Sequence, residues 1–232
     1  GEYITKERLE IKGLGKAKYI LKPGGTLGDL YTNSDLVYNE DGYIEVDKNG
    51  NVAVKDDYLD DIYLGSVFPK YNLAWRNDFN YKGINLGVLL TARIGGICYS
   101  ATQANMDLYG VSEASAAARD AGGVLINGRD MIDAQKWYQV IGSQSGLPQY
   151  YTYSATNVRL QELSLGYTLP TKWFRDKMRM TVSFVGRNLW MIYCKAPFDP
   201  EAVASTGLNY QGIDYFMMPS MRNLGFNVKF QF

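Results

Sequence analysis

Histidine and cysteine, on which many catalytic and metal sites depend, are scarce in this sequence. It contains no histidine, which excludes Ser-His-Asp triads, Cys-His pairs and histidine metal sites. The two cysteines, Cys98 and Cys194, are too far apart for a CxxC motif, and whether they pair is open. Asp47, Asn49 and Asn51 have the first spacings of a calcium loop, but the glycine and glutamate that an EF-hand requires are missing. We therefore expect no catalytic residue, no metal and no cofactor.

Aromatic residues are the second group that could contact a ligand, since their rings stack on sugars and on peptide side chains. They make up 14% of the chain, with 19 Tyr, 9 Phe and 4 Trp. Five of them fall in one predicted loop: Trp137, Tyr138, Tyr150, Tyr151 and Tyr153. We predict that these five contact substrate, with packing inside the loop or at a membrane interface as the alternative for each.

Composition narrows the class of protein. The 24 basic and 24 acidic residues cancel, so the chain lacks the basic character of a nucleic-acid binder. No apolar run reaches the roughly 18 residues of a membrane helix. The mean hydropathy of -0.24 does not exclude a membrane β-barrel, whose alternating strands give a weak hydropathy signal. Abundant tyrosine and glycine favour β-structure.

The elements that must position these residues are strands with one apolar and one polar face. In 221–232, the side chains of Leu224, Phe226 and Val228 alternate with polar ones, which is the period of a strand. The same alternation predicts strands over 71–81, 84–94, 157–169 and 178–190. Apolar residues change parity near Gln161, where we expect a β-bulge.

The connections between these strands are alternately short and long. Residues 82–83 and 170–177 form short turns, whereas 95–156 and 191–220 are long. Bacterial outer-membrane barrels have short periplasmic turns and long extracellular loops. The pattern therefore predicts an all-β fold, an antiparallel transmembrane β-barrel. Its extracellular loops would be 95–156 and 191–220, and we expect 13–70 to be another extracellular loop. A soluble sandwich with an aromatic core is the alternative.

The long connections contain weaker signals. Residues 43–54 read as a hairpin around Asn49-Gly50, and 112–121 read as a short helix capped by Ser112. Residues 3–12 are a candidate for one more barrel strand. The chain begins at Gly1 without a visible signal peptide, so its start reads as a cut.

Several blocks resemble the C-terminal third of the SusC/RagA-type TonB-linked outer-membrane proteins of Bacteroidetes. They occupy 24–31, 63–86, 157–170 and the pair 185–190 and 198–201, followed by the closing strand 221–232. The blocks occur in family order over most of the chain. One departure is Ser66-Val67, where Asn-Pro is usual in the family.

The resemblance implies a barrel of about 22 strands in the Gram-negative outer membrane, with this chain supplying the last five or six and with the N-terminal plug absent. It implies import of glycans or peptides, with a SusD-like surface lipoprotein and the TonB complex as partners and no enzymatic activity. The polar face would line the bore with Arg76, Asp78, Arg93, Arg179, Arg187 and Lys229, and Phe232 would be the signal for barrel assembly. The alternatives are a soluble or surface-attached carbohydrate-binding β-domain and, as a third, a glycosidase, for which no carboxylate pair has an assignable spacing.

Overall fold

The computed structural model describes residues 9–12, 15–56, 60–143, 146–204 and 210–232. The chain divides into two compact units, each built from three stretches of sequence. The sheet unit comprises 69–95, 154–202 and 218–232, and the loop unit comprises the described residues of 1–68, 96–153 and 203–217. The two units are described separately below.

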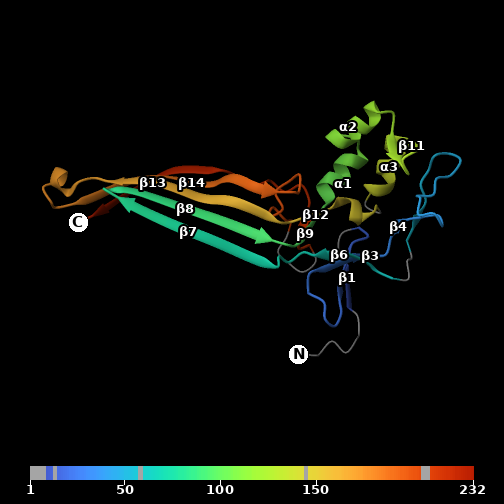
Figure 1. Cartoon of the computed structure of the whole chain (residues 1–232), viewed down its shortest axis with the longest axis horizontal. Coiled ribbons are helices and arrows are strands. Elements are labelled where there is room, and N and C mark those ends of the chain that lie inside the picture. The colour runs from blue at the N-terminus through green and yellow to red at the C-terminus, as the bar shows by residue number, and fades with distance from the viewer. Residues whose placement is uncertain (1–8, 13–14, 57–59, 144–145, 205–209) are drawn as a thin grey trace. The chain divides into compact units, whose positions relative to one another are not determined.

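The sheet unit is one antiparallel sheet of five strands in the order β16-β14-β13-β8-β7. The strands are β7 (Tyr71–Tyr81), β8 (Ile84–Ile94), β13 (Asn157–Thr168), β14 (Arg179–Cys194) and β16 (Asn223–Gln231). Figure 1 shows β7, β8, β13 and β14 running side by side. All five were expected from alternation, and β14 continues four residues beyond the predicted end at 190.

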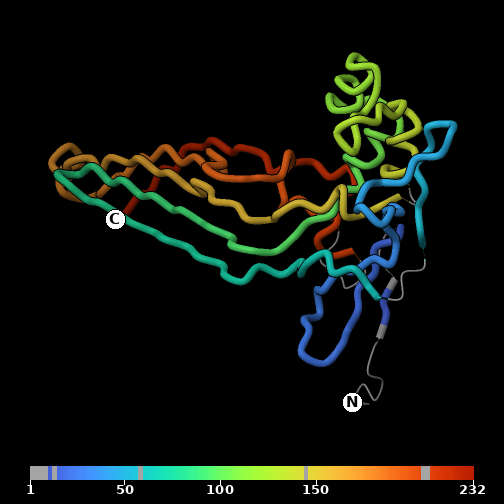
Figure 2. The backbone as a smooth tube through the Cα atoms, turned by 45° about the vertical axis from the view of Figure 1, so that its right-hand side comes forward, coloured from blue at the N-terminus to red at the C-terminus, as the bar shows by residue number. Residues whose placement is uncertain are grey.

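The turn between β7 and β8 consists of two residues, as predicted. Lys82 and Gly83 have φ angles of 47° and 86°, the left-handed backbone of a tight hairpin turn that matches the twist of the strands. Gly83 is also required by space, because a Cβ there would lie 2.9 Å from the carbonyl oxygen of Thr168. This turn and the turn between β13 and β14 lie at the same end of the sheet (Figure 2).

The predicted bulge in β13 is confirmed. The register of β13 shifts between Leu160 and Glu162 against both of its neighbours, β8 and β14. One extra residue, Gln161, is thereby absorbed. The shift keeps Val158 and Leu160 on the same face as Leu163, although their positions differ in parity.

The loop unit contains a four-stranded antiparallel sheet in the order β1-β2-β3-β6. Its strands are β1 (Leu9–Lys12), β2 (Lys18–Leu21), β3 (Asp29–Thr32) and β6 (Ile62–Ser66). The prediction of a barrel strand over 3–12 is wrong for its described part, because Leu9–Lys12 pair with β2 and do not join the five-stranded sheet. Residues 3–8 lie outside the described residues.

The interval 95–156, predicted as a loop, holds most of the helical structure. Its helices are α1 (Ala101–Leu108), α2 (Glu113–Asp120), α3 (Ala134–Ile141) and the 3-10 turn η1 (Pro148–Tyr151). The predicted helix at 112–121 is confirmed as α2, and Ser112 caps it by accepting a hydrogen bond from the amide of Ser115. None of the helices among the described residues is long and apolar enough to cross a membrane.

Short strands complete the loop unit. They are β9 (Ile97–Ser100), β12 (Thr152–Ser154) and β15 (Ile213–Asp214) in one sheet, and the pairs β10 (Val124–Ile126) with β11 (Asp130–Ile132) and β4 (Asp35–Leu36) with β5 (Val54–Lys55). These elements enclose a hydrophobic core that includes Leu30, Leu36, Trp137, Tyr151 and Ile213.

The predicted turn around Asn49-Gly50 is present, and its chemistry is internal. Val46 and Val52 form the bridge that closes it. The carboxylate of Asp47 accepts hydrogen bonds from the amides of Asn49, at 2.7 Å, and of Asn51, at 2.8 Å. These bonds, with the amide of Asn51 contributing most, lower the pKa of Asp47 below its usual value. Asp47 therefore stabilises its own turn.

Candidate functional site

One face of the five-stranded sheet carries apolar side chains from edge to edge. A single row across it joins Phe79, Leu86, Leu165, Phe184 and Phe226, each opposite the next. Phe184 and Phe226 meet edge to face, with ring centroids 5.4 Å apart. Of these side chains Phe226 is 80% exposed and Leu165 is 55% exposed. The face is therefore apolar and exposed at once.

The rows on either side of this one have the same character. The row on one side contains Tyr81, Ile84, Tyr167, Val182 and Val228. On the other side, the first row contains Val88, Leu163 and Leu224, and the second contains Trp75, Leu90, Leu160 and Trp190. Asn77, opposite Val88, is the polar exception. Contiguous exposed apolar surface on this scale marks a contact with lipid or with another protein.

The opposite face is polar, as the alternation predicts. The register places all six predicted bore residues on it: Arg76, Asp78, Arg93, Arg179, Arg187 and Lys229. The bulge carries Glu162 to this face as well, opposite Arg187 on β14. Two faces of largely opposite polarity on one sheet are typical of a wall between lipid and water.

Charged side chains on the polar face form a chain of ion pairs across three strands. The Glu162 carboxylate accepts a hydrogen bond from Nε of Arg187 at 2.9 Å, and Nη1 of Arg76 lies 3.7 Å from its other oxygen. Arg76 in turn donates from Nε to Asp78 at 2.9 Å. Both arginines are more than half exposed, so this array faces open space.

Glycine makes the array possible at β8, the strand that lies between these partners. A Cβ on Gly87 would lie 2.9 Å from Oδ1 of Asp78 and 2.5 Å from the hydroxyl of Ser164. Both distances are too short for real contacts, so a larger residue would displace the two polar side chains. The absence of a side chain at Gly87 therefore leaves room above β8 for the side chains of Asp78 from β7 and Ser164 from β13.

A second polar cluster lies where the strands pass into the segment 195–222. Arg159 of β13 is 2% exposed and forms an ion pair with Asp199 through both carboxylate oxygens. Its Nη1 also donates to the hydroxyl of Ser220 at 3.1 Å, and its Nε donates to the side chain of Asn157 at 3.1 Å. A buried guanidinium needs this many acceptors to offset its lost hydration.

Asp199 holds this cluster in its charged form. Burial on its own raises the pKa of Asp199, but hydrogen bonds from Arg159, from Ser220 and from the amide of Glu201 outweigh it and lower the pKa to about 2. The bond from the amide of Glu201 also fixes the turn at Pro200. The block at 198–201 thus forms a turn that carries a buried ion pair, which was not predicted.

Asn188 links the cluster to β14. It adopts a φ of 51°, a left-handed conformation that asparagine tolerates better than other side chains. Its amide group donates to the carbonyl oxygens of Ser220, at 2.9 Å, and Met221, at 3.3 Å. A cavity of about 420 Å³ is lined by Arg159, Asn188, Asp199 and Arg222, among others. Because Asp199 is paired with the Arg159 guanidinium, these two charges anchor the segment to β13.

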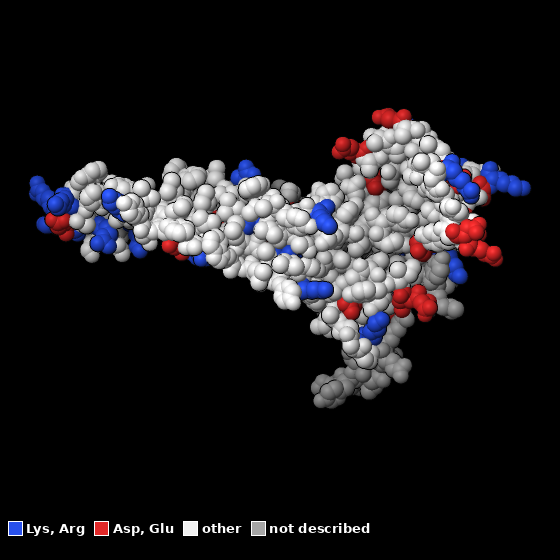
Figure 3. Space-filling model, viewed as in Figure 1, with Lys and Arg blue, Asp and Glu red and all other residues white. Residues whose placement is uncertain are grey.

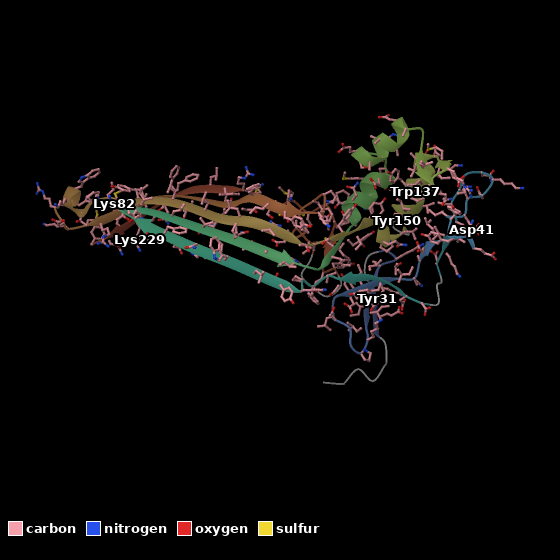
Figure 4. The ribbon with its side chains drawn as sticks, in the orientation of Figure 1. Tyr31, Asp41, Lys82, Trp137, Tyr150 and Lys229 are labelled. Atoms are coloured by element: carbon pink, nitrogen blue, oxygen red, sulfur yellow. The ribbon has the colours of Figure 1, made fainter. Side chains whose placement is uncertain are left out.

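The five predicted substrate residues lie in the loop unit with unequal exposure. Trp137 and Tyr151 belong to its hydrophobic core, with 7% and 2% exposure, and burial raises the pKa of the Tyr151 hydroxyl. Tyr138 and Tyr153 pack against the core from its edge. Tyr150 is the most exposed, and its ring lies edge-on to Trp137 with centroids 5.9 Å apart (Figure 4). Burial favours the packing role for Trp137 and Tyr151, and substrate contact stays a prediction for all five.

Three further predicted residues are placed as follows. Cys98 and Cys194 carry thiols and not a disulfide, the first buried and the second part-buried. Phe232 is almost fully exposed, and its role in assembly stays a prediction. Among the described residues no group of three His, Cys, Asp or Glu side chains could hold a metal ion.

Comparison with known proteins gives one curated relative and several solved structures. The chain is 25% identical over 198 residues to "TonB-dependent receptor P3" of Formosa agariphila, a match that covers 81% of this chain and 19% of the relative. No family model matches. The chain therefore spans about a fifth of the length of the curated relative that it matches.

The fold matches the RagAB peptide importer. In its "closed-closed" state the TM-score is 0.52 at 17% identity, and in its "open-open" state it is 0.54 at 15% identity. Each match covers 96% of this chain and 28% or 27% of the solved chain, so at this identity they show a shared fold over a part of a larger barrel. The chain is therefore similar in sequence to part of a TonB-dependent receptor, and its two-faced sheet shares the fold of part of a TonB-dependent transporter barrel.

Proposed function

We propose that the five-stranded sheet is part of the wall of an outer-membrane importer that takes up peptides or glycans with energy supplied through TonB. The observation that carries this proposal is the exposed apolar face, which continues through every strand of the sheet. Strands of about 9–11 residues are long enough to cross the hydrocarbon core when tilted, and β7 and β8 have 11 residues each.

The alternative of a soluble sandwich requires these apolar faces to meet each other in a dry core. Instead Trp75 and Phe79 are each 53% exposed, and every residue of β16 is exposed. Such a surface is costly in water but stable against lipid tails, so the membrane is the environment that fits it. The exposure of these apolar side chains is the physical reason for preferring a barrel wall to a carbohydrate-binding β-domain.

The two edge strands of the sheet favour pairing with further strands of the same barrel. β7 and β16 are the edge strands and each has one neighbour among the described residues. Lipid does not tolerate an unpaired strand edge, because nothing there satisfies its backbone groups. We propose that further strands of the same receptor pair with both edges and that the short turns face the periplasm and the long connections the cell exterior.

The partners and substrate follow from the relatives as part of this proposal. A relative described as a peptide importer favours peptides, and glycans are the alternative that the aromatic side chains would suit. A SusD-like lipoprotein at the cell surface and the TonB complex are the proposed partners, and we assign no catalytic role. Uptake of defined peptides and defined oligosaccharides by cells that carry the full-length receptor decides the substrate class.

A matched pair of substitutions tests the barrel wall. Phe226 and Asn227 are adjacent on β16 and point to opposite faces. Arginine on the lipid face should cost about 2 kcal/mol, whereas arginine facing a watery bore should cost little. We expect Phe226→Arg to lower the amount of full-length receptor assembled in the outer membrane and Asn227→Arg to leave it close to wild type, measured by heat-modifiable mobility of membrane fractions. Equal losses for both variants would exclude the two-faced wall.

A further inference from the structure

The end of the sheet unit where the short turns lie is basic. Lys82 lies in the turn between β7 and β8, and Lys172, Arg175 and Lys177 lie in the turn between β13 and β14. We call these four residues the basic rim. All four are exposed, and Figure 3 shows Lys and Arg side chains gathered at this end of the strands, with little charge along the strands in this view. Lys82 marks the same end in Figure 4.

The basic rim has almost no compensating charge. Asp176 is the acidic residue in these two turns, and one of its carboxylate oxygens accepts a hydrogen bond from the hydroxyl of Thr171 at 2.8 Å. Within the described part of the chain no carboxylate forms an ion pair with any residue of the rim. The basic rim therefore presents four exposed cations without ion-pair partners among the described residues. Such a cluster of positive charge favours the binding of an anion at the rim.

The backbone that carries the rim is strained. Arg175 and Asp176 have φ angles of 54° and 58°, so two consecutive residues other than glycine adopt the left-handed conformation. Side chains with a Cβ disfavour this conformation, and glycine would avoid most of the cost. A glycine at 175 would relieve the backbone strain but would also remove a cation. The turn therefore keeps the positive charge of Arg175 in spite of the strain.

The rim borders the apolar face at the level where aromatic rings collect. Tyr81 is 69% exposed and Trp173 is 71% exposed, each within one residue of a rim cation in sequence. Nζ of Lys82 lies 5.3 Å from the centre of the Tyr81 ring. Aromatic rings of this kind sit among lipid headgroups, and lysine and arginine beside them extend toward the phosphates.

We propose that the basic rim binds the phosphate groups of anionic glycerophospholipids in the leaflet next to the short turns. The cations would thus hold this end of the sheet at the headgroup level, while the apolar face lies against the acyl chains. The inference rests on the proposed function, since it requires the apolar face to be in a bilayer. It adds a lipid-binding site that the two-faced wall alone does not imply.

The test compares two triple variants of the full-length receptor. The rim variant is Lys172→Gln, Arg175→Gln and Lys177→Gln. The control variant, Lys70→Gln, Lys195→Gln and Arg222→Gln, removes the same charge from exposed residues next to the opposite ends of the strands. Each receptor is placed in nanodiscs of phosphatidylglycerol and phosphatidylcholine with identical acyl chains, and the lipids retained after release are counted by native mass spectrometry.

We expect the wild type and the control variant to retain phosphatidylglycerol in preference to phosphatidylcholine. The rim variant should lose this preference by about a hundredfold, since each of the three cations near a charged membrane surface contributes an attraction of about fivefold. Concentrated salt should weaken the preference of the wild type, which tests the site without any substitution. Equal loss in both variants, or no preference in the wild type, would overturn the inference.

Two outcomes separate this inference from the proposed function. If inorganic phosphate displaces phosphatidylglycerol as effectively as the free lipid does, the rim is a phosphate site and the lipid assignment is wrong. If the receptor enters nanodiscs but retains both lipids equally, the inference fails while the barrel wall stands. If the receptor does not enter a bilayer at all, the proposed function fails first.

Discussion

The two units of the chain treat their apolar side chains in opposite ways. In the loop unit Leu30, Leu36 and Ile213 are completely buried. In the sheet unit the large apolar side chains that the structure describes are exposed or part-buried, and the long side chains that are buried are polar, with Asn157 at 1% and Arg159 at 2% exposure. One chain therefore contains a unit arranged for water and a unit arranged for lipid on one side and water on the other.

The difference explains why whole-chain composition says little about environment. Burial of apolar surface stabilises a fold by about 25 cal/mol per Å² only when the alternative environment is water. In the loop unit the stabilisation comes from apolar side chains that bury one another inside the unit. In the sheet unit it comes from apolar side chains that contact lipid. Polar interactions then hold the sheet unit to its connecting segment, because its apolar side chains face outward and cannot form a core there.

The largest expected effect is in the core of the loop unit. Trp137 of α3 is 7% exposed, and Trp137→Ala should destabilise the loop unit by about 4 kcal/mol through lost burial and a cavity. Hydrogen exchange of the full-length receptor, read peptide by peptide, is the measurement, because it resolves units of different stability. Exchange should rise in α1, α3 and η1 and stay unchanged in β7 and β8.

Tyr109→Ala provides the control for this prediction, since Tyr109 is 75% exposed in the same unit. It should leave exchange in α3 close to wild type. Faster exchange in the long strands after Trp137→Ala would show that the two units unfold together and would remove the basis of the comparison.

The next largest effect tests the polar anchoring of the sheet unit. Asp199→Asn keeps the shape of the side chain but leaves the Arg159 guanidinium buried without its main counter-charge. Removing one partner of a buried ion pair typically costs about 3 kcal/mol or more. We expect the segment 195–222 to become sensitive to protease while the five strands keep their protection. Glu201→Gln should have a smaller effect, because Glu201 is 41% exposed and 3.4 Å from Arg159.

The same ion pair gives a pH dependence with a defined sign. The pKa of Asp199 is lowered to about 2 in the folded protein, whereas an unfolded aspartate titrates near 3.9. The stabilisation is therefore fully present above about pH 4 and is lost as the pH falls through the folded pKa. Protease resistance of the segment should fall over this interval in the wild type and change little in Asp199→Asn, which is already susceptible.

The faces of the sheet were predictable from the sequence because strand periodicity is local. A period of two assigns a face to each residue of β7, β8 and β16 without knowledge of the partner strand. The bulge at Gln161 was also visible, since Leu160 and Leu163 share a face only if one residue is absorbed between them. The long strands were therefore found within a few residues.

The buried cluster and the core of the loop unit required information that is not local. Arg159 and Asp199 are 40 positions apart, and neither neighbourhood signals the other. The burial of Trp137 had a weak signal, because Ala134, Trp137 and Ile141 recur at the spacing of one helical face. β1 was misassigned because a strand of four residues in either sheet looks the same until its partner is known.

The smallest expected effect is on the polar face of the sheet unit. Glu162→Gln removes the carboxylate between Arg76 and Arg187, but both arginines are more than half exposed and can be hydrated instead. We expect no measurable change in heat-modifiable mobility in concentrated salt, and a slight loss of stability in dilute salt, where screening is weaker. The contrast with Asp199→Asn is the informative quantity, since both substitutions remove one carboxylate from an arginine partner in the same unit. A loss as large as that of Asp199→Asn would mean that the polar face is dry, and the sheet would then have no watery side.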